Sequence, residues 1–238
     1  MAANKGWSRP GFCVGLTSIL SEIRSIDTMD VLDKMKYHLD EATDRDNAKG
    51  IIIGRAFCLA AIIKSHRAQD NEKVFLSVLH ELFKILRSRD YLRQLAVELI
   101  IQLFVSSSSL ITEALREGVN EKLTRIGPEL TTDPDLALLL FRTKQLGLIT
   151  DAQFRIFWGS VDIVVDKENV KGKSGKCFDK LKALLNDATK RHPKRHPVVD
   201  VICTAALQTD NFEDFWRFYE KDLPRLSWEK KYVVMDGE

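Results

Sequence analysis

Apolar residues recur along almost the whole chain at spacings of three and four, which is the period of an α-helix. Strict alternation of apolar and polar residues, typical of a half-buried strand, is nearly absent. Only residues 161–165 look strand-like, and at this length a packed connector or a helix start fits them at least as well. The pattern therefore predicts an all-α protein.

The first half of the chain reads as five helices. Arg9-Pro10-Gly11 opens the first, and Asp27 or Thr28 caps the second. The third, residues 47–67, is apolar on nearly all sides, so we expect other helices to cover more than one of its faces. Two amphipathic helices follow, over residues 71–86 and 91–105. The side chains predicted to face inward on the first helix are Phe12, Leu16, Ile19, Leu20 and Ile23, and those on the second are Val31, Leu32, Met35 and Leu39.

The second half of the chain predicts further helices, which are shorter. Residues 106–109 predict a break, Gly127-Pro128 ends the next helix, and Asp133-Pro134 caps a helix over residues 136–145. Another short helix is expected from Thr150-Asp151 to residue 158. Helices of this length with short connections pack as antiparallel neighbours. We expect an irregular armadillo- or HEAT-like α-solenoid of antiparallel helical pairs, forming one domain over residues 1–238, rather than a closed bundle.

The composition indicates the cellular compartment of the protein but no class of enzyme. The 36 basic residues nearly balance the 34 acidic ones, so the overall charge does not indicate a nucleic-acid partner. Four scattered cysteines, with no C-x-x-C pair, suit reduced, buried thiols in the cytosol or nucleus: Cys13, Cys58, Cys177 and Cys203. The longest apolar run, residues 51–63, is short of the roughly 20 residues that span a bilayer. We expect no membrane partner.

A rigid corner lies at His192-Pro193-Lys194-Arg195-His196-Pro197-Val198-Val199-Asp200. Two prolines four residues apart cannot lie inside a helix, whereas Pro197 suits the first turn of a new one. His192 and His196 could be read as metal ligands, but no Cys pair or acidic trio accompanies them. We predict instead that His196 caps the helix at Pro197 and that His192 ends the preceding helix, with no metal.

Positive charge concentrates around this corner. Residues 166–196 include ten basic residues and only four acidic ones, and we interpret this segment as an internal connector. A phosphate-binding loop is excluded because the glycine and lysine spacing near residue 172 does not match G-x-x-x-x-G-K-[ST], and no small-molecule cofactor is expected. The alternatives are contact with RNA or DNA and a solvated face beside a nuclear-import signal at residues 190–195. The candidate nucleic-acid contacts are Lys171, Lys173, Lys176, Lys180, Lys182, Lys190, Arg191, Lys194 and Arg195.

Other chemical signals are weak. The sequence contains no G-x-S-x-G or H-E-x-x-H motif. Arg55 is an isolated charged residue in an apolar helix. At such a position an arginine more often extends to solvent at the helix edge or forms a buried ion pair than binds the carboxylate of a partner. An aromatic group near the C-terminal end indicates either a core or a partner surface: Phe212, Phe215, Trp216, Phe218, Tyr219 and Trp228.

Four segments occur in a recognisable order. They are Arg9-Pro10-Gly11-Phe12 with Leu16 and Ile19-Leu20, Gly54-Arg55-Ala56-Phe57 with Leu59-Ala60-Ala61 and Ile62, the corner at residues 192–200, and Phe215-Trp216 with Ser227 and Glu229-Lys230-Lys231-Tyr232. Together they resemble the N-terminal region of the Myb-binding protein 1A family, also called the DNA polymerase V or polymerase phi family. Val199 departs from the family pattern, because relatives often have Trp there.

The resemblance implies an armadillo-like helical protein of the nucleolus. It implies roles in ribosomal RNA gene transcription, ribosome assembly and the binding of transcription regulators, and relatives that are longer than this chain. We therefore expect a non-enzymatic scaffold whose partners are nucleolar and transcription-regulatory proteins. A polymerase-type enzyme is the alternative in the family's name, although the metal-binding aspartate motifs of replicative polymerases are absent from this sequence. A helical adaptor that carries cargo is a further alternative.

Overall fold

The computed structural model describes residues 8–40, 48–69, 71–158, 174–191, 196–207, 213 and 215–217. Within residues 174–191 it describes the side chains of 181–188 and 190. Every regular element in these ranges is a helix, so the predicted all-α class is confirmed. Residues 161–165 lie outside the described residues. No helix in the described ranges is both long and apolar enough to cross a bilayer.

The chain divides into two compact units, residues 1–115 and 116–238. A single repeat domain over residues 1–238 stays a prediction. The first unit contains α1 (Ser8–Glu22), α2 (Thr28–His38), α3 (Ala48–Lys64), α4 (Glu72–Ser88), the short 3₁₀ helix η1 (Asp90–Leu92), α5 (Arg93–Ser106) and η2 (Ser108–Leu110). The break predicted at residues 106–109 is confirmed, because α5 ends at Ser106.

Capping side chains set where the helices of the first unit begin. Asp27 precedes α2 in an extended conformation, and its carboxylate accepts a hydrogen bond of 2.8 Å from the amide of Met29. Of the two predicted caps, Asp27 is therefore the one used. Asn71 caps α4 in the same way, accepting from the amides of Lys73 and Val74 at 3.0 and 3.3 Å. Such caps satisfy amides that a helix N-terminus leaves without partners.

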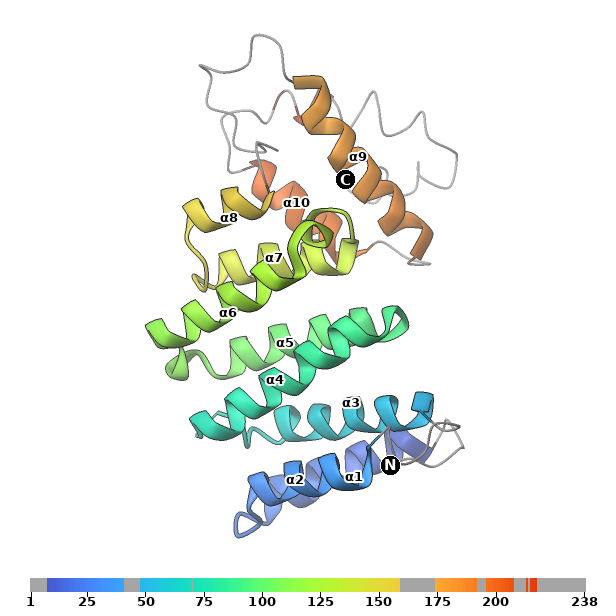
Figure 1. Ribbon diagram of the computed structural model, residues 1–238, viewed down its shortest axis with the longest axis vertical. Helices are drawn as coiled ribbons and strands as arrows, with labels where there is room; N and C mark the ends of the chain where they lie inside the picture. The colour runs from blue at the N-terminus through green and yellow to red at the C-terminus, as the bar shows by residue number, and fades with distance from the viewer. Residues whose placement is uncertain are drawn as a thin grey trace. The chain divides into compact units, whose positions relative to one another are not determined.

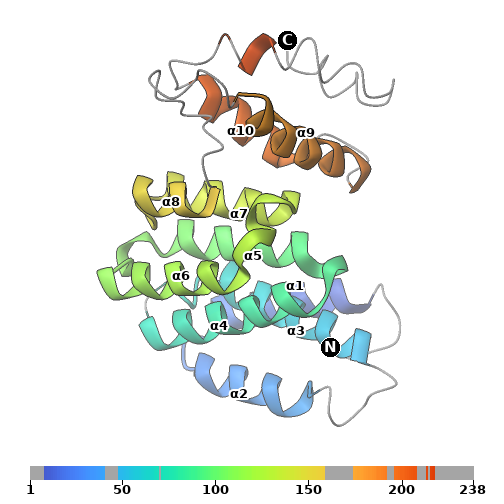
Figure 2. The same ribbon diagram turned by 45° about the horizontal axis from the view of Figure 1, so that its top comes forward.

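Helix α3 forms the centre of the first unit. It packs against α1, α2, α4 and α5, and Figure 1 shows it between α1 and α5. Figure 2 shows the same helices after a turn of 45°. Its buried side chains point in almost every direction around the helix. This arrangement explains why the sequence of α3 is apolar on nearly all sides, and it confirms that several helices cover it.

The inward face predicted for α1 is mostly wrong. Leu20 is fully buried, but Phe12, Ile19 and Ile23 are 53%, 47% and 47% exposed. Cys13, which is absent from the predicted inward face, is buried, as expected for a reduced thiol. Apolar residues occupy more than one side of α1, and α3 covers the side that carries Cys13 and Leu20. On α2, by contrast, Leu32, Met35 and Leu39 are buried as predicted, with Val31 half-buried.

The second unit is built around α7 (Pro134–Gln145). The other helices described in this part of the chain are α6 (Glu113–Ile126), whose first turn spans the boundary, the 3₁₀ helix η3 (Gly127–Thr131), α8 (Asp151–Trp158), α9 (Ser174–Arg191) and α10 (Pro197–Leu207). Helix α7 packs against η3, α8, α9 and α10. Gly127 ends α6 with a φ of 68°, a left-handed conformation that glycine adopts without strain, as the predicted stop at this position requires.

The predicted cap at Asp133-Pro134 is also confirmed. The Asp133 carboxylate accepts from the amides of Asp135 and Leu136 at 3.0 and 3.2 Å, and Pro134 occupies the first helical position. Three aromatic rings then join α7 to α8: the Phe141 centroid lies 5.2 Å from that of Phe154 and 4.9 Å from that of Trp158. Of the predicted C-terminal aromatic group, Phe215 is buried and Trp216 is exposed, while the others lie outside the described residues.

Candidate functional site

The basic segment is described only in part. Helix α9 packs against α7 and α10 through an apolar stripe that includes Leu181, Leu184 and Leu185. Lys182 and Lys190 lie off this stripe, the first half-buried and the second exposed. The remaining predicted contacts fall on residues or side chains outside the description: Lys171, Lys173, Lys176, Lys180, Arg191, Lys194 and Arg195. The nucleic-acid interface therefore stays a prediction, and two of its lysines are placed on one helix.

The corner before α10 carries a buried histidine whose predicted role is confirmed. His196 is 3% exposed, and its Nδ1 accepts a hydrogen bond of 3.1 Å from the amide of Val198. This contact caps α10 as a Ser, Thr or Asn side chain caps other helices. His192 lies outside the described residues. Among the residues that the structure describes, no group of three or more His, Cys, Asp or Glu side chains could hold a metal ion.

The other nitrogen of this ring makes a contact that the sequence did not predict. His196 Nε2 lies 3.1 Å from Oδ1 of Asp135, a buried side chain in the first turn of α7. Because Nδ1 accepts from an amide, the ring carries its proton on Nε2 and donates it to the carboxylate. One side chain therefore joins the N-terminal ends of α7 and α10. The two residues are 61 positions apart, so no local pattern signals the pair.

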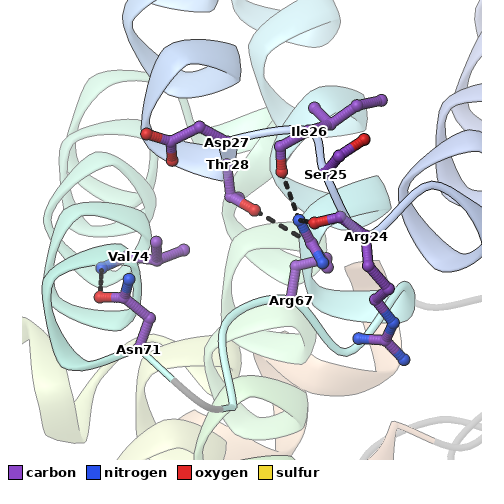
Figure 3. A pocket seen from close by; sticks show the side chains of 8 residues that line it. All are labelled: Arg24, Ser25, Ile26, Asp27, Thr28, Arg67, Asn71 and Val74. Atoms are coloured by element: carbon purple, nitrogen blue, oxygen red, sulfur yellow. Dashed lines mark hydrogen bonds between the residues drawn. The ribbon is translucent and has the colours of Figure 1, made fainter.

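A second polar cluster lines a hollow of about 360 Å³ beside the turn between α1 and α2 (Figure 3). Arg67, just after α3, donates from Nη2 to the carbonyl of Arg24 at 3.0 Å and to that of Ile26, and from Nε to Thr28 Oγ1 at 3.2 Å. Figure 3 shows its guanidinium inside the turn formed by residues 24–28. These bonds fasten the α1–α2 turn to the end of α3, so Arg67 has a structural role.

Two other arginines of the first unit lack such partners. Arg9 in α1 and Arg55 in α3 are half-buried, and the Nε atom of each is enclosed with no hydrogen-bond acceptor. Within the described ranges, no ion pair joins either guanidinium to a carboxylate. The buried ion pair considered for Arg55 is thus not found in this part of the chain.

Cysteines of the first unit lie in the interface between α1 and α3. Cys13 and Cys58 are buried free thiols, and Cys203 of α10 is a half-buried free thiol. Burial, and to a smaller extent the nearby Cys13, raises the pKa of Cys58 to about 11. A thiol with so high a pKa is almost fully protonated near neutral pH and reacts slowly.

The sequence model of the DNA polymerase phi family matches residues 1–235. The chain belongs to the DNA polymerase phi family. Neither the search of curated proteins nor that of solved structures found a match. The family assignment therefore rests on this match, and it confirms the resemblance described above.

In this member of the DNA polymerase phi family, the resembling segments occupy positions with clear structural roles. Residues 9–12 form the first turn of α1, and residues 54–57 lie on the central helix α3. The corner supplies the His196 cap and the buried Val199, whose side chain is 1% exposed. Ser227 and residues 229–232 lie outside the described residues.

Proposed function

We propose that the chain is a non-enzymatic interaction scaffold of the nucleolus, acting in ribosomal RNA gene transcription and ribosome biogenesis. Its membership of the DNA polymerase phi family is the observation that carries the proposal. Its partners are nucleolar and transcription-regulatory proteins, with RNA or DNA as an additional partner of the basic segment. The localisation and the partners follow from the family resemblance.

The all-α architecture supports a binding role. Large apolar side chains stay exposed on several helices of each unit, among them Phe12 of α1, Tyr37 of α2 and Ile156 of α8. Clustered exposed apolar residues are typical of surfaces that bind proteins, whereas single ones are common on any protein. The cluster on α1 is therefore the more informative of these positions.

Charge supports a second, polyanionic partner. The excess of basic residues between 166 and 196 stands out in a chain whose total charge is +2, and Lys190 of this segment is exposed. Lysine and arginine side chains that contact phosphates release counterions, which makes binding strongly salt-dependent. We propose that this segment retains RNA or DNA while the helical faces bind proteins.

Charge reversal tests this second contact. Lys190, Arg191, Lys194 and Arg195 are changed together to Glu, and retention on ribosomal RNA is measured over a salt series with the full chain. Loss of four phosphate contacts is expected to weaken binding and to lower the slope of log K against log salt by about 3 to 4 on a duplex.

A matched control reverses four exposed basic residues of the first unit instead: Lys34, Lys64, Lys73 and Arg87. The control is expected to retain the salt slope of the natural sequence. An unchanged slope in the Lys190 to Arg195 variant would remove the nucleic-acid contact from the proposal.

The polymerase alternative makes a different prediction. Extension of a primed template by the purified chain with Mg²⁺, lost on substitution of a specific carboxylate pair, would overturn the scaffold assignment. Enrichment of import factors in place of nucleolar assembly factors, on retrieval from nuclear extract, would favour a cargo-carrying adaptor.

A further inference from the structure

Helices α1 and α3 lie side by side and run in the same direction. They pack against each other, and Arg67, just after α3, donates to the carbonyls of Arg24 and Ile26, just after α1. The C-terminal ends of the two helices are therefore adjacent. Nearer the N-terminal ends, Cys13 lies close enough to Cys58 to raise the pKa of its thiol, so these two residues are also neighbours.

This pairing places two arginines at the same level. Arg9 lies one turn before Cys13 on α1, and Arg55 lies about one turn before Cys58 on α3. Both are half-buried with an enclosed Nε atom that has no acceptor. A partly buried cation costs free energy unless an acidic group and hydrogen-bond acceptors complete its surroundings. Within the described residues the pair has no such group, so it is suited to receive one from outside.

An apolar strip begins next to this pair. Phe12, Ile19 and Ile23 are 53%, 47% and 47% exposed, and their positions fall within about 40° of one another around the helix. Arg9 precedes Phe12 by three residues, so the two side chains are neighbours on the helix surface. We call Phe12, Ile19 and Ile23 the α1 strip. It presents about three turns of apolar surface with positive charge at its N-terminal end.

We propose that the α1 strip binds an acidic amphipathic helix of a partner protein, with carboxylates of that helix on Arg9 and Arg55. An amphipathic helix places apolar anchors at spacings of three, four and seven residues, which match the spacing of the strip. A carboxylate accepts two parallel hydrogen bonds from a guanidinium and neutralises its charge. The inference rests on the proposed scaffold function and names the chemistry of one partner.

A second copy of this chain fits the strip less well. The only carboxylate of α1 is that of Glu22. Glu22 lies on the other flank of the strip, about 140° around the helix from Arg9. Two copies of α1 paired through the strip therefore leave the arginines without carboxylates. A nucleic-acid backbone neutralises guanidinium groups but leaves the apolar side chains exposed to water.

Two designed peptides test the proposal. Each is a fluorescent helix about 18 residues long with leucines along one face; one carries glutamates at the end that meets Arg9 and Arg55, and the other carries lysines there. Binding to the full chain is measured by fluorescence anisotropy. The acidic peptide is expected to bind at least about tenfold more tightly than the basic one.

Substitutions locate the binding site. Arg9→Gln, Arg55→Gln and Ile19→Ser are each expected to weaken the acidic peptide by about tenfold. The matched controls are Val14→Ser, which changes an apolar residue of α1 that is 67% exposed but off the strip, and Arg24→Gln, which changes an exposed arginine. Both controls are expected to bind as the natural sequence does. Thermal melts of the free variants check the fold, and the acidic peptide is expected to raise the melting temperature only where Arg9 and Arg55 are intact.

Three results would overturn the proposal: equal binding of the two peptides, full binding by Arg9→Gln and Arg55→Gln, or dimerisation of the full chain that Ile19→Ser abolishes. A fourth is peptide binding that appears only after Glu41, Asp44 and Asp46 are changed to Asn or Gln, because the chain's own acidic residues would then be the occupant. None of these results affects the salt-dependent retention that tests the nucleic-acid contact in the proposed function.

Discussion

Replacing His196 tests how the second unit joins α7 to α10. The ring accepts from the Val198 amide and donates to Asp135 through its other nitrogen, each at 3.1 Å. Three substitutions at this position separate the effects of the two hydrogen bonds. His196→Asn keeps an acceptor near the position of Nδ1, His196→Gln keeps a donor near that of Nε2, and His196→Ala removes both.

The structure sets the order of the three effects. Loss of a cap costs about 1 kcal/mol, and a buried carboxylate left without its donor costs about 1 to 3 kcal/mol. His196→Ala is therefore expected to lower the free energy of unfolding of the second unit by about 3 kcal/mol. His196→Asn is expected to cost about 2 kcal/mol and His196→Gln about 1 kcal/mol, because each keeps one contact.

The assay is urea unfolding followed by tryptophan fluorescence, since Trp158 is buried between helices of the same unit. Hydrogen exchange at the Val198 amide reports the cap directly and is expected to accelerate in the Gln and Ala variants but not in the Asn variant. A stability of His196→Ala within about 0.5 kcal/mol of the natural sequence would refute this account. Rapid exchange at Val198 in the Asn variant would refute the division of roles.

Two predictions concern the first unit. Burial raises the Cys58 pKa from its ordinary value of 9.0 to about 11, so the folded state holds a proton that the unfolded state releases. The stability that this thiol contributes is present below about pH 9 and is lost as the pH rises to about 11. Cys58→Ala is expected to make the fall in stability less steep in unfolding experiments between about pH 8 and about pH 10.5. An equally steep fall in the variant would contradict the burial of the thiol. Arg67→Met removes three hydrogen bonds to the α1–α2 turn and is expected to cost about 2 to 3 kcal/mol. A loss of stability matched by the exposed-site variant Arg87→Met would show that these bonds contribute little.

Local signals in the sequence predicted most of the fold. Asp27, Asp133-Pro134 and Gly127 act at fixed positions relative to a helix end, so each predicts its boundary without knowledge of the rest of the chain. The apolar character of α3 also predicted its central position, because a helix that is apolar on all sides needs cover on all sides.

Contacts between distant residues could not be predicted in the same way. On α1 the apolar residues lie on more than one side, and the sequence does not say which side α3 will cover. Phe12, Ile19 and Ile23 are exposed against the prediction for this reason. The bonds of Arg67 to the α1–α2 turn and of His196 to Asp135 join residues about 40 and 61 positions apart. Their existence depends on packing that no local pattern records.

Crosslinking of the full-length protein in intact nucleoli, with the contacted residues mapped, tests the scaffold function most directly. We expect crosslinks from the helical faces to transcription-regulatory and ribosome-assembly proteins, and from residues 171–195 to RNA or DNA. A chain that forms no such crosslinks in nucleoli, or whose crosslinks join it only to import factors, would contradict the proposed function.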